Sequence, residues 1–258
     1  MRALITGASS GLGMEMAKVL ASRGYDLILV ARRKEKLEEL KDTLNVDVQI
    51  IPLDLSSTFN CMKLYNKVKK MKIDILINNA GFGLFGEFTD TKLERELDMI
   101  DLNIKTVHTL TKLFLCEFMN ENRGYILNVA SSAAYFSGPL MSSYYATKAY
   151  ILHLTEAIQE EVRQSRRKVY VGCLCPGPVE TEFNKVAGVE FSLKSLPKEY
   201  VATYAIDKML KGKQIIIPGF KMKAIIFFSR FMPRRLLTHI NYYNQQKKGK
   251  NVWVLGYW

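Results

Sequence analysis

The sequence has few cysteines and histidines, and neither residue type is spaced as a disulfide framework or a metal site would require. Four cysteines are spread over 258 residues, and the close pair Cys173 and Cys175 lies in the apolar run VYVGCLC. Such a run is typical of a buried strand, so we expect core thiols and a reducing compartment. The three histidines show no ligand spacing, so no metal is expected.

Long apolar runs, linkers and internal repeats are also missing. No apolar run approaches the roughly 18 residues that a membrane-spanning helix needs. No Gly/Ser-rich or Pro-rich stretch interrupts the first 210 residues, and 48% of the chain is hydrophobic. The start MRALIT is too short before a glycine-rich turn to be a secretory signal. These features predict one large domain, located in the cytoplasm.

Acidic residues are nearly absent from the last fifth of the chain. Residues 207–258 hold eleven Lys or Arg and one acid, a net +10 of the total +12. We predict a domain at residues 1–219 and a basic amphipathic extension at residues 220–258, broken near Pro233. The extension could lie peripherally on an anionic membrane, cover the substrate site or pack in a subunit interface. A disordered or nucleic-acid-binding tail is less favoured.

Short apolar runs alternate with amphipathic segments up to about residue 217. The runs RALI, DLILV, VQIIPL, DILI, YILNV, VYVGCLC and KQIIIPG have the pattern of buried strands, and helical patterns separate them. This alternation implies βαβ crossovers. We therefore predict an α/β fold, a doubly wound parallel sheet of about seven strands with helices on both faces.

Polar and glycine-rich segments follow each predicted strand. They are TGASSGLG, ARR, DLS, NNAG, SS and PGPVET. The carboxyl ends of parallel strands form the ligand crevice of an open sheet, so these segments should meet there. The glycines Gly7, Gly11 and Gly13 would let the backbone approach a pyrophosphate at a helix N-terminus, or simply permit tight packing. Their spacing differs from the common G-x-G-x-x-G dinucleotide fingerprint.

With NNAG, YYATK ending at Lys148, and PGPVET, the sequence resembles the short-chain dehydrogenase/reductase family over about residues 1–217. The resemblance implies a single Rossmann-type domain that binds a nicotinamide dinucleotide. It gives the pyrophosphate and ribose the residues Gly7, Ser9, Ser10, Gly11, Leu12 and Gly13. It gives the adenine side Asp54 and Leu55, the central wall Asn79, Ala80 and Gly81, and the carboxamide Val179 and Thr181, with Pro176 and Gly177 in the same turn.

The end of the second predicted strand bears on the choice of dinucleotide. An acidic residue there would accept hydrogen bonds from a ribose 2′-hydroxyl, whereas a 2′-phosphate needs positive charge. The chain has Arg32, Arg33 and Lys34, with no acid before Glu35. Arg32 can present a planar guanidinium to the phosphate, with a hydrogen bond added by Ser9. We therefore expect NADP(H).

Two adjacent tyrosines precede the lysine of YYATK. On a helix both Tyr144 and Tyr145 can reach Lys148. Spacing to serine does not separate them, because Ser131 and Ser132 lie thirteen residues before Tyr144 and Tyr145 respectively. The family motif is Tyr-x-x-x-Lys with a serine thirteen residues before the tyrosine. The resemblance thus selects Ser131, Tyr144 and Lys148, and Tyr145 is expected to pack or line the pocket.

The resemblance also implies the catalytic roles. Tyr144 would be the general acid in reduction and the base in oxidation, and Ser131 would hydrogen-bond the substrate oxygen. Lys148 would hold the nicotinamide ribose and lower the pKa of Tyr144. Asn103, in DLNIKT, would keep a water that relays protons to the lysine.

Apolar residues crowd the loops around this predicted site. About half are expected to be ordinary core, and the others would suit a lipophilic ketone or aldehyde. They are Phe82, Leu84, Phe85, Tyr135, Phe136, Leu140, Met141, Phe183, Val186 and Phe191. We therefore predict an NADPH-dependent carbonyl reductase, which the resemblance implies to be a homo-oligomer, a dimer or tetramer. The alternative is a non-catalytic NADP(H)-binding regulator whose basic tail contacts a membrane or partner.

Overall fold

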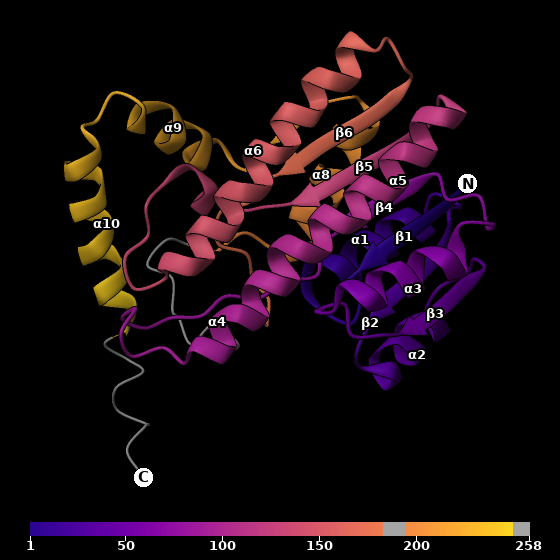
Figure 1. Ribbon diagram of the computed structural model, residues 1–258, viewed down its shortest axis with the longest axis horizontal. Helices are drawn as coiled ribbons and strands as arrows, with labels where there is room; N and C mark the ends of the chain where they lie inside the picture. Colours follow the sequence, from indigo (N-terminus) through magenta and orange to yellow (C-terminus); the bar gives the residue numbers. More distant parts are fainter. Residues whose placement is uncertain (183–194, 250–258) are drawn as a thin grey trace.

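The computed structural model describes residues 1–182 and 195–249 (Figure 1). Within these ranges one parallel sheet of seven strands has the order β3-β2-β1-β4-β5-β6-β7, which confirms the predicted doubly wound sheet. The strands are β1 Arg2–Thr6, β2 Asp26–Ala31, β3 Val48–Pro52, β4 Ile75–Asn78, β5 Gly124–Val129, β6 Val169–Leu174 and β7 Ile215–Ile216.

The helices follow the strands as the alternating pattern predicts. They are α1 Gly11–Ala21, α2 Lys34–Asp42, α3 Thr58–Val68, α4 Leu93–Ile100, α5 Val107–Glu121, α6 Ser142–Gln164, α8 Lys198–Leu210, α9 Phe220–Ser229 and α10 Arg234–Gly249, with a π-helix η1 at Asp101–Thr106 and a 3-10 turn η2 at Ser132–Tyr135. Among the described residues no helix is long and apolar enough to cross a bilayer.

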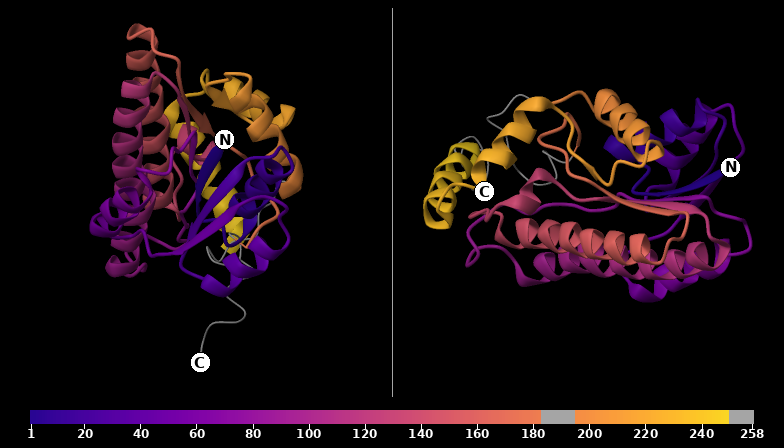
Figure 2. Two further views of the ribbon diagram at one scale, coloured as in Figure 1. Left: turned by 90° about the vertical axis from the view of Figure 1, so that its right-hand side faces the viewer. Right: turned by 90° about the horizontal axis from the view of Figure 1, so that it is seen from above.

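Alternate strand residues supply two cores, one on each face of the sheet. Ala3 and Ile5 of β1 belong to one cluster of buried side chains, whereas Leu4 between them belongs to the other. Helices α1, α2 and α8 contribute to the first cluster, and α3, α5 and α6 to the second (Figure 2, right). Because both faces are covered, nearly every residue of the central strands must be apolar.

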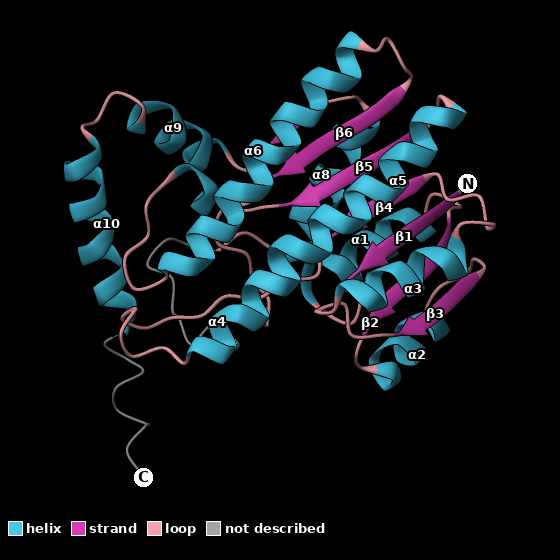
Figure 3. Cartoon of the chain, viewed as in Figure 1, coloured by secondary structure: helices cyan, strands magenta, loops and turns pink. Residues whose placement is uncertain are grey.

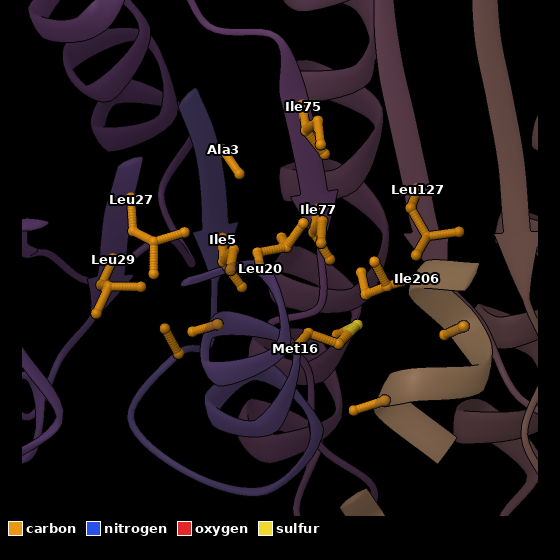
Figure 4. Close-up of a cluster of buried hydrophobic side chains, with 14 of the residues drawn as sticks. Ala3, Ile5, Met16, Leu20, Leu27, Leu29, Ile75, Ile77, Leu127 and Ile206 are labelled. Carbon is orange, nitrogen blue, oxygen red and sulfur yellow. The ribbon is translucent and has the colours of Figure 1, made fainter. Parts of the chain in front are cut away.

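Figure 4 shows the first of these cores. Met16 and Leu20 of α1 and Ile206 of α8 lie beside Ile5 and Ile77 of the sheet, all fully buried. Each such side chain contributes about 1.5–3 kcal/mol by leaving water. This packing fixes where α1 begins, and therefore where the glycine-rich turn before it lies.

The cysteines are free thiols, as expected. Cys61, Cys173 and Cys175 are buried, and Cys116 is exposed. Cys173 lies in β6 and Cys175 just after its end. Their Sγ atoms are 3.6 Å apart.

After β7 the chain forms two helices, α9 and α10, with Pro233 in the connection at the predicted break. Figure 3 shows the arrows of β5 and β6 pointing toward the side of the molecule where these two helices lie. The final segment NVWVLGYW and the loop residues Phe183, Val186 and Phe191 are outside the described residues.

Candidate active site

The turn between β1 and α1 has room only for glycine at two of its positions. Gly7 has φ +66°, in the left-handed region, and a Cβ there would lie 2.8 Å from Cα of Ala80. A Cβ on Gly13 would lie 2.3 Å from the carbonyl oxygen of Gly7. The first turn of α1 therefore packs directly against the loop, and its N-terminus points at the space above the sheet.

Hydrogen bonds tie this turn to the end of β4. Thr6 Oγ1 accepts from the backbone N–H groups of Asn79 and Ala80, both at 3.0 Å. Asn79 Nδ2 donates to the carbonyl oxygens of Thr6 at 3.1 Å and Gly7 at 3.2 Å. The glycine turn and NNAG thus form one wall, because the side chains of Thr6 and Asn79 satisfy backbone groups of the facing segment.

A single cavity of about 950 Å³ lies over the carboxyl ends of the strands. It brings together all but two of the predicted site residues. Those lining it are Gly7, Ser9, Ser10, Gly11, Leu12, Arg32, Arg33, Asp54, Leu55, Asn79, Ala80, Gly81, Ser131, Tyr144, Lys148, Pro176, Gly177, Val179 and Thr181. Gly13 and Asn103 lie behind the wall, where Gly13 permits the close packing described above.

At the adenine end of the cavity, Arg33 is more engaged than Arg32. Its guanidinium donates to Ser9 Oγ at 3.2 Å and Ser10 Oγ at 2.8 Å, and it pairs with Glu182 at 3.2 Å. Arg32 lies 3.9 Å from Asp54 and is largely exposed. It is Arg33, the N-cap of α2, whose side chain contacts Ser9 in this structure. The predicted role of Arg32 and Ser9 at a 2′-phosphate stays a prediction.

Helix α6 carries two of the catalytic candidates on its buried side. Tyr144, Lys148, Ile151 and Thr155 recur at spacings of three or four and face the sheet, whereas Tyr145 lies beside this stripe. Lys148 Nζ donates to the carbonyl oxygen of Val129 at 2.9 Å. The helix therefore delivers the tyrosine and the lysine to the same side of the cavity.

Burial shifts the pKa values of these two candidates in opposite directions. It lowers the pKa of Lys148 from 10.5 to about 8. It raises the pKa of Tyr144, and a hydrogen bond with Ser131 only partly offsets this. The lowered tyrosine pKa that the resemblance implies is therefore not found in the nucleotide-free protein, since desolvation favours the neutral form of both side chains.

Asn103 lies on the π-helix η1 that separates α4 from α5. Its Nδ2 donates to the carbonyl oxygen of Phe82 at 2.9 Å and to Thr147 Oγ1 at 3.1 Å, and its Oδ1 accepts from Phe82 N at 3.1 Å. It thereby joins the loop after β4 to α6, next to Gly81. The π-helix, a feature frequent at functional sites, joins α4 directly to α5.

The C-terminal helices line the outer part of the same cavity. Asn241 Nδ2 donates to the carbonyl oxygen of Ser137 at 3.0 Å, and Gln245 Nε2 donates to Tyr145 Oη at 2.5 Å. On α9, Met222 packs against Gly177, where a Cβ would lie 2.8 Å from its Cε. Of the roles considered for the extension, covering the site is the one these contacts match.

Sequence reasoning missed most of the lining that α9, α10 and their connection supply. Its members are Met222, Ile225, Phe228, Ser229, Met232, Leu237, Ile240, Asn241, Asn244 and Gln245. Of the apolar loop residues expected near the site, Phe82, Phe136 and Met141 line the cavity. Leu84, Phe85 and Tyr135 pack in buried clusters instead, in line with the expected division between core and pocket.

Comparison with known proteins identifies the family. The family model for short chain dehydrogenases matches residues 1–189. The chain belongs to the short-chain dehydrogenase family. An uncharacterized oxidoreductase of Staphylococcus epidermidis is 33% identical over 217 residues, which are 83% of this chain and 92% of that protein.

Two further relatives of this short-chain dehydrogenase are informative. Human 17-beta-hydroxysteroid dehydrogenase type 3 is 31% identical over 252 residues, covering 92% of this chain and 80% of that protein. The solved structure of a short-chain dehydrogenase from Sphingobium yanoikuyae in complex with NADPH has a TM-score of 0.80 and 29% identity, covering 89% of this chain and 94% of that one. The protein is an oxidoreductase with a nicotinamide cofactor.

The residues present fit such a cofactor. A Cβ on Gly7 would collide with Ala80, so this glycine lets the turn pack tightly on NNAG. Gly7 and Gly11 also line the cavity and carry no side chain that would fill it. Arg33, Ser9 and Ser10 offer donors at one end, and Lys148 and Tyr144 lie at the other. A dinucleotide needs this combination of bare backbone, anion-binding donors and a catalytic end.

Proposed function

We propose that this short-chain dehydrogenase is an NADPH-dependent oxidoreductase that reduces a lipophilic ketone or aldehyde to an alcohol, or catalyses the reverse reaction. The observation that carries the proposal is the shared cavity. Ser131, Tyr144 and Lys148 line the same space as the glycine turn and the two arginines. Hydride chemistry on a carbonyl needs both a nucleotide site and a proton donor within one enclosed volume.

A bound nicotinamide supplies the hydride in reduction and accepts it in oxidation. Tyr144 holds the proton that the substrate oxygen receives, and its raised pKa keeps the phenol protonated until that transfer. Ser131, already hydrogen-bonded to Tyr144, donates to the same substrate oxygen. Lys148 supplies the positive charge that stabilises the phenolate left behind. Asn103 positions the loop at Phe82 against α6, and a water relay through it stays a prediction.

The preference for NADP(H) rests on positive charge at the end of β2. Arg33 holds Ser9 and Ser10 and is paired with Glu182, and Arg32 lies beside it on the cavity wall. A 2′-phosphate would replace the carboxylate of Glu182 as the partner of Arg33, because both are anions that accept from a guanidinium. The ribose hydroxyl of NAD(H) offers no comparable charge.

The lipophilic substrate rests on the outer wall of the cavity. Phe82, Phe136 and Met141 line it from the body, and α9 and α10 add further apolar side chains. Such a lining suits a bulky apolar carbonyl better than a sugar or an acid. The name of the human relative, a hydroxysteroid dehydrogenase, agrees with this class of substrate.

The test compares the two adjacent tyrosines. Tyr144→Phe should lower kcat for NADPH oxidation by about 100-fold or more, because general acids contribute about that factor, while NADPH still binds. Tyr145→Phe is the matched control and should retain turnover of small ketones. Both variants are assayed with aliphatic, aromatic and polar carbonyl compounds.

Equal loss in both variants would contradict the assignment of Tyr144. Preference for polar carbonyls would refute the lipophilic substrate. NADPH binding without turnover of any carbonyl would favour the non-catalytic regulator. A homo-oligomer and a cytoplasmic location remain predictions, to be checked by light scattering and by fractionation of cells.

A further inference from the structure

Helices α9 and α10 expose an unusual amount of apolar surface. Eight large hydrophobic side chains on them and their connection are at least 38% exposed, and six of these are here called the apolar rim. The apolar rim consists of Ile225, Phe227, Phe228, Phe231, Leu236 and Ile240. Phe227 contacts both Phe228 and Phe231, with ring centroids 5.4 and 5.6 Å apart, so the aromatic part is one cluster. A soluble surface rarely leaves such a cluster in water without a partner.

The apolar rim borders the mouth of the substrate cavity. Ile225, Phe228 and Ile240 are exposed and also line the cavity, while Met222 and Leu237 continue the lining inward. An apolar path therefore runs from the outer surface of α9 and α10 into the space beside Tyr144.

The charge on the segment that carries the rim has a single sign. Residues 220–258 contain no Asp or Glu. Arg230, Arg234 and Arg235 are exposed beside the rim, and none of them forms an ion pair with the described part of the chain. The rim therefore presents cations without internal counterions, together with apolar side chains.

These two properties narrow the choice of partner. A second copy of this surface would bring the same positive charges face to face. A nucleic acid would supply anions but no hydrocarbon for the aliphatic side chains. An anionic bilayer supplies both, because acyl chains receive apolar groups while lipid headgroups attract Arg and Lys. We propose that the apolar rim docks on the surface of an anionic phospholipid membrane and, resting on the proposed function, takes lipophilic substrate from it.

The test measures binding of the full chain to sedimenting vesicles. Wild type should bind vesicles of phosphatidylcholine with about 30% phosphatidylserine, should bind pure phosphatidylcholine weakly, and should dissociate at about 1 M salt. Phe227→Ser/Phe231→Ser should weaken binding at least about tenfold, because two exposed aromatic side chains lose their apolar contact. Neither phenylalanine lines the cavity, so turnover of small ketones should not change.

The second tail variant removes charge. Arg234→Gln/Arg235→Gln should weaken binding about 25-fold, because each basic residue near an anionic surface contributes about fivefold. Matched controls lie on α3, where Phe59, Lys63 and Lys67 are also exposed. Phe59→Ser and Lys63→Gln/Lys67→Gln should bind as wild type does.

Absence of wild-type binding to anionic vesicles would overturn the proposal. Binding of the two tail variants as tight as that of wild type would also overturn it. A dimer that becomes monomeric in the tail variants, without vesicle binding, would assign the surface to a second copy instead. Substrate entry has its own readout. Anionic vesicles should raise kcat/KM for a membrane-partitioned ketone in wild type and in the control variants but not in the tail variants, and no rise in wild type would refute substrate entry from the membrane. Vesicle binding with no carbonyl turnover would contradict the proposed function but not the docking.

Discussion

Lys148 is a buried cation, and its replacement by methionine should stabilise the protein while abolishing catalysis. The residue is 6% exposed, and its ammonium group donates to the carbonyl oxygen of Val129. Within the described residues, no acidic side chain forms an ion pair with this ammonium group. Methionine has a similar length and no charge, so Lys148→Met removes the desolvation penalty and keeps most of the packing.

The size of the effect follows from the shifted pKa. Lowering the pKa of Lys148 from 10.5 to about 8 means that the charged form is disfavoured in the folded state. One pKa unit corresponds to about 1.4 kcal/mol. At a pH below both pKa values, the shift therefore lowers the free energy of unfolding of wild type by about 3 kcal/mol. Loss of the hydrogen bond to Val129 destabilises the variant by about 1 kcal/mol and reduces this gain. The nucleotide-free variant should therefore be about 2 kcal/mol more stable than wild type at neutral pH.

The advantage should depend on pH in a defined window. Between about pH 8 and pH 10.5 the unfolded wild type binds a proton at Lys148 that the folded protein does not, so wild-type stability rises with pH. By about pH 9.5 the advantage of Lys148→Met should have fallen by about 2 kcal/mol, to near zero. Other titrating groups are shared by both proteins and cancel in the difference.

Urea denaturation of both proteins without nucleotide, at about pH 7 and about pH 9.5, measures this difference. Lys112→Met on α5, where the lysine is exposed, is the control and should show no pH-dependent gain. A variant less stable than wild type at neutral pH, or a difference that is equal at both pH values, would refute the reasoning.

Two further predictions concern contacts across the cavity. Glu182→Gln should tighten NADPH binding about two- to fivefold, the range for one partly exposed ion pair, because Arg33 no longer has a competing partner. Fluorescence titration checks it, and an equal gain for NADH would contradict the phosphate explanation. Gln245→Leu should raise KM for bulky apolar ketones about fivefold, since one hydrogen bond to Tyr145 holds α10 in place. Gln246 is exposed, so Gln246→Leu is the control and should leave KM unchanged. An equal rise of KM in both variants would refute the role of Gln245.

The fold was predictable because its determinants are local. Strands such as Leu27–Leu29 are apolar on both faces, and amphipathic stretches separate them, which is enough to imply a parallel sheet covered on both sides. The π-helix at Asp101–Thr106 was not predictable in this way. One extra residue in a turn leaves the hydrophobic pattern on either side nearly unchanged, so α4 and α5 resemble one helix in the sequence.

The candidate site was predicted almost completely on the body of the protein. Resemblance was needed to choose between Tyr144 and Tyr145, although the sequence holds a physical signal. Tyr144 and Lys148 continue the buried stripe of Ile151 and Thr155, and Tyr145 does not. The geometry at Arg33 could not be foreseen, because it depends on a bend after β2.

The sequence left several alternatives for residues 220–258, and covering the substrate site was one of them. The contact of Gln245 with Tyr145 joins residues 100 positions apart. No periodicity or spacing reveals such a pairing, since it depends on the direction in which the chain leaves β7. Composition showed a basic and apolar extension without showing which surface of the molecule receives it.

The two adjacent tyrosines have a consequence for exchanging parts between relatives. Tyr144, the proposed general acid, lines the cavity, and Tyr145 accepts a hydrogen bond from Gln245 of α10. One peptide bond therefore separates the proposed proton donor from the residue that contacts the helix covering the cavity. A foreign C-terminal segment grafted after Gly219 would need its own donor for Tyr145 in order to be seated. Without that match, the graft would change both which molecules enter and how firmly the neighbouring general acid is held.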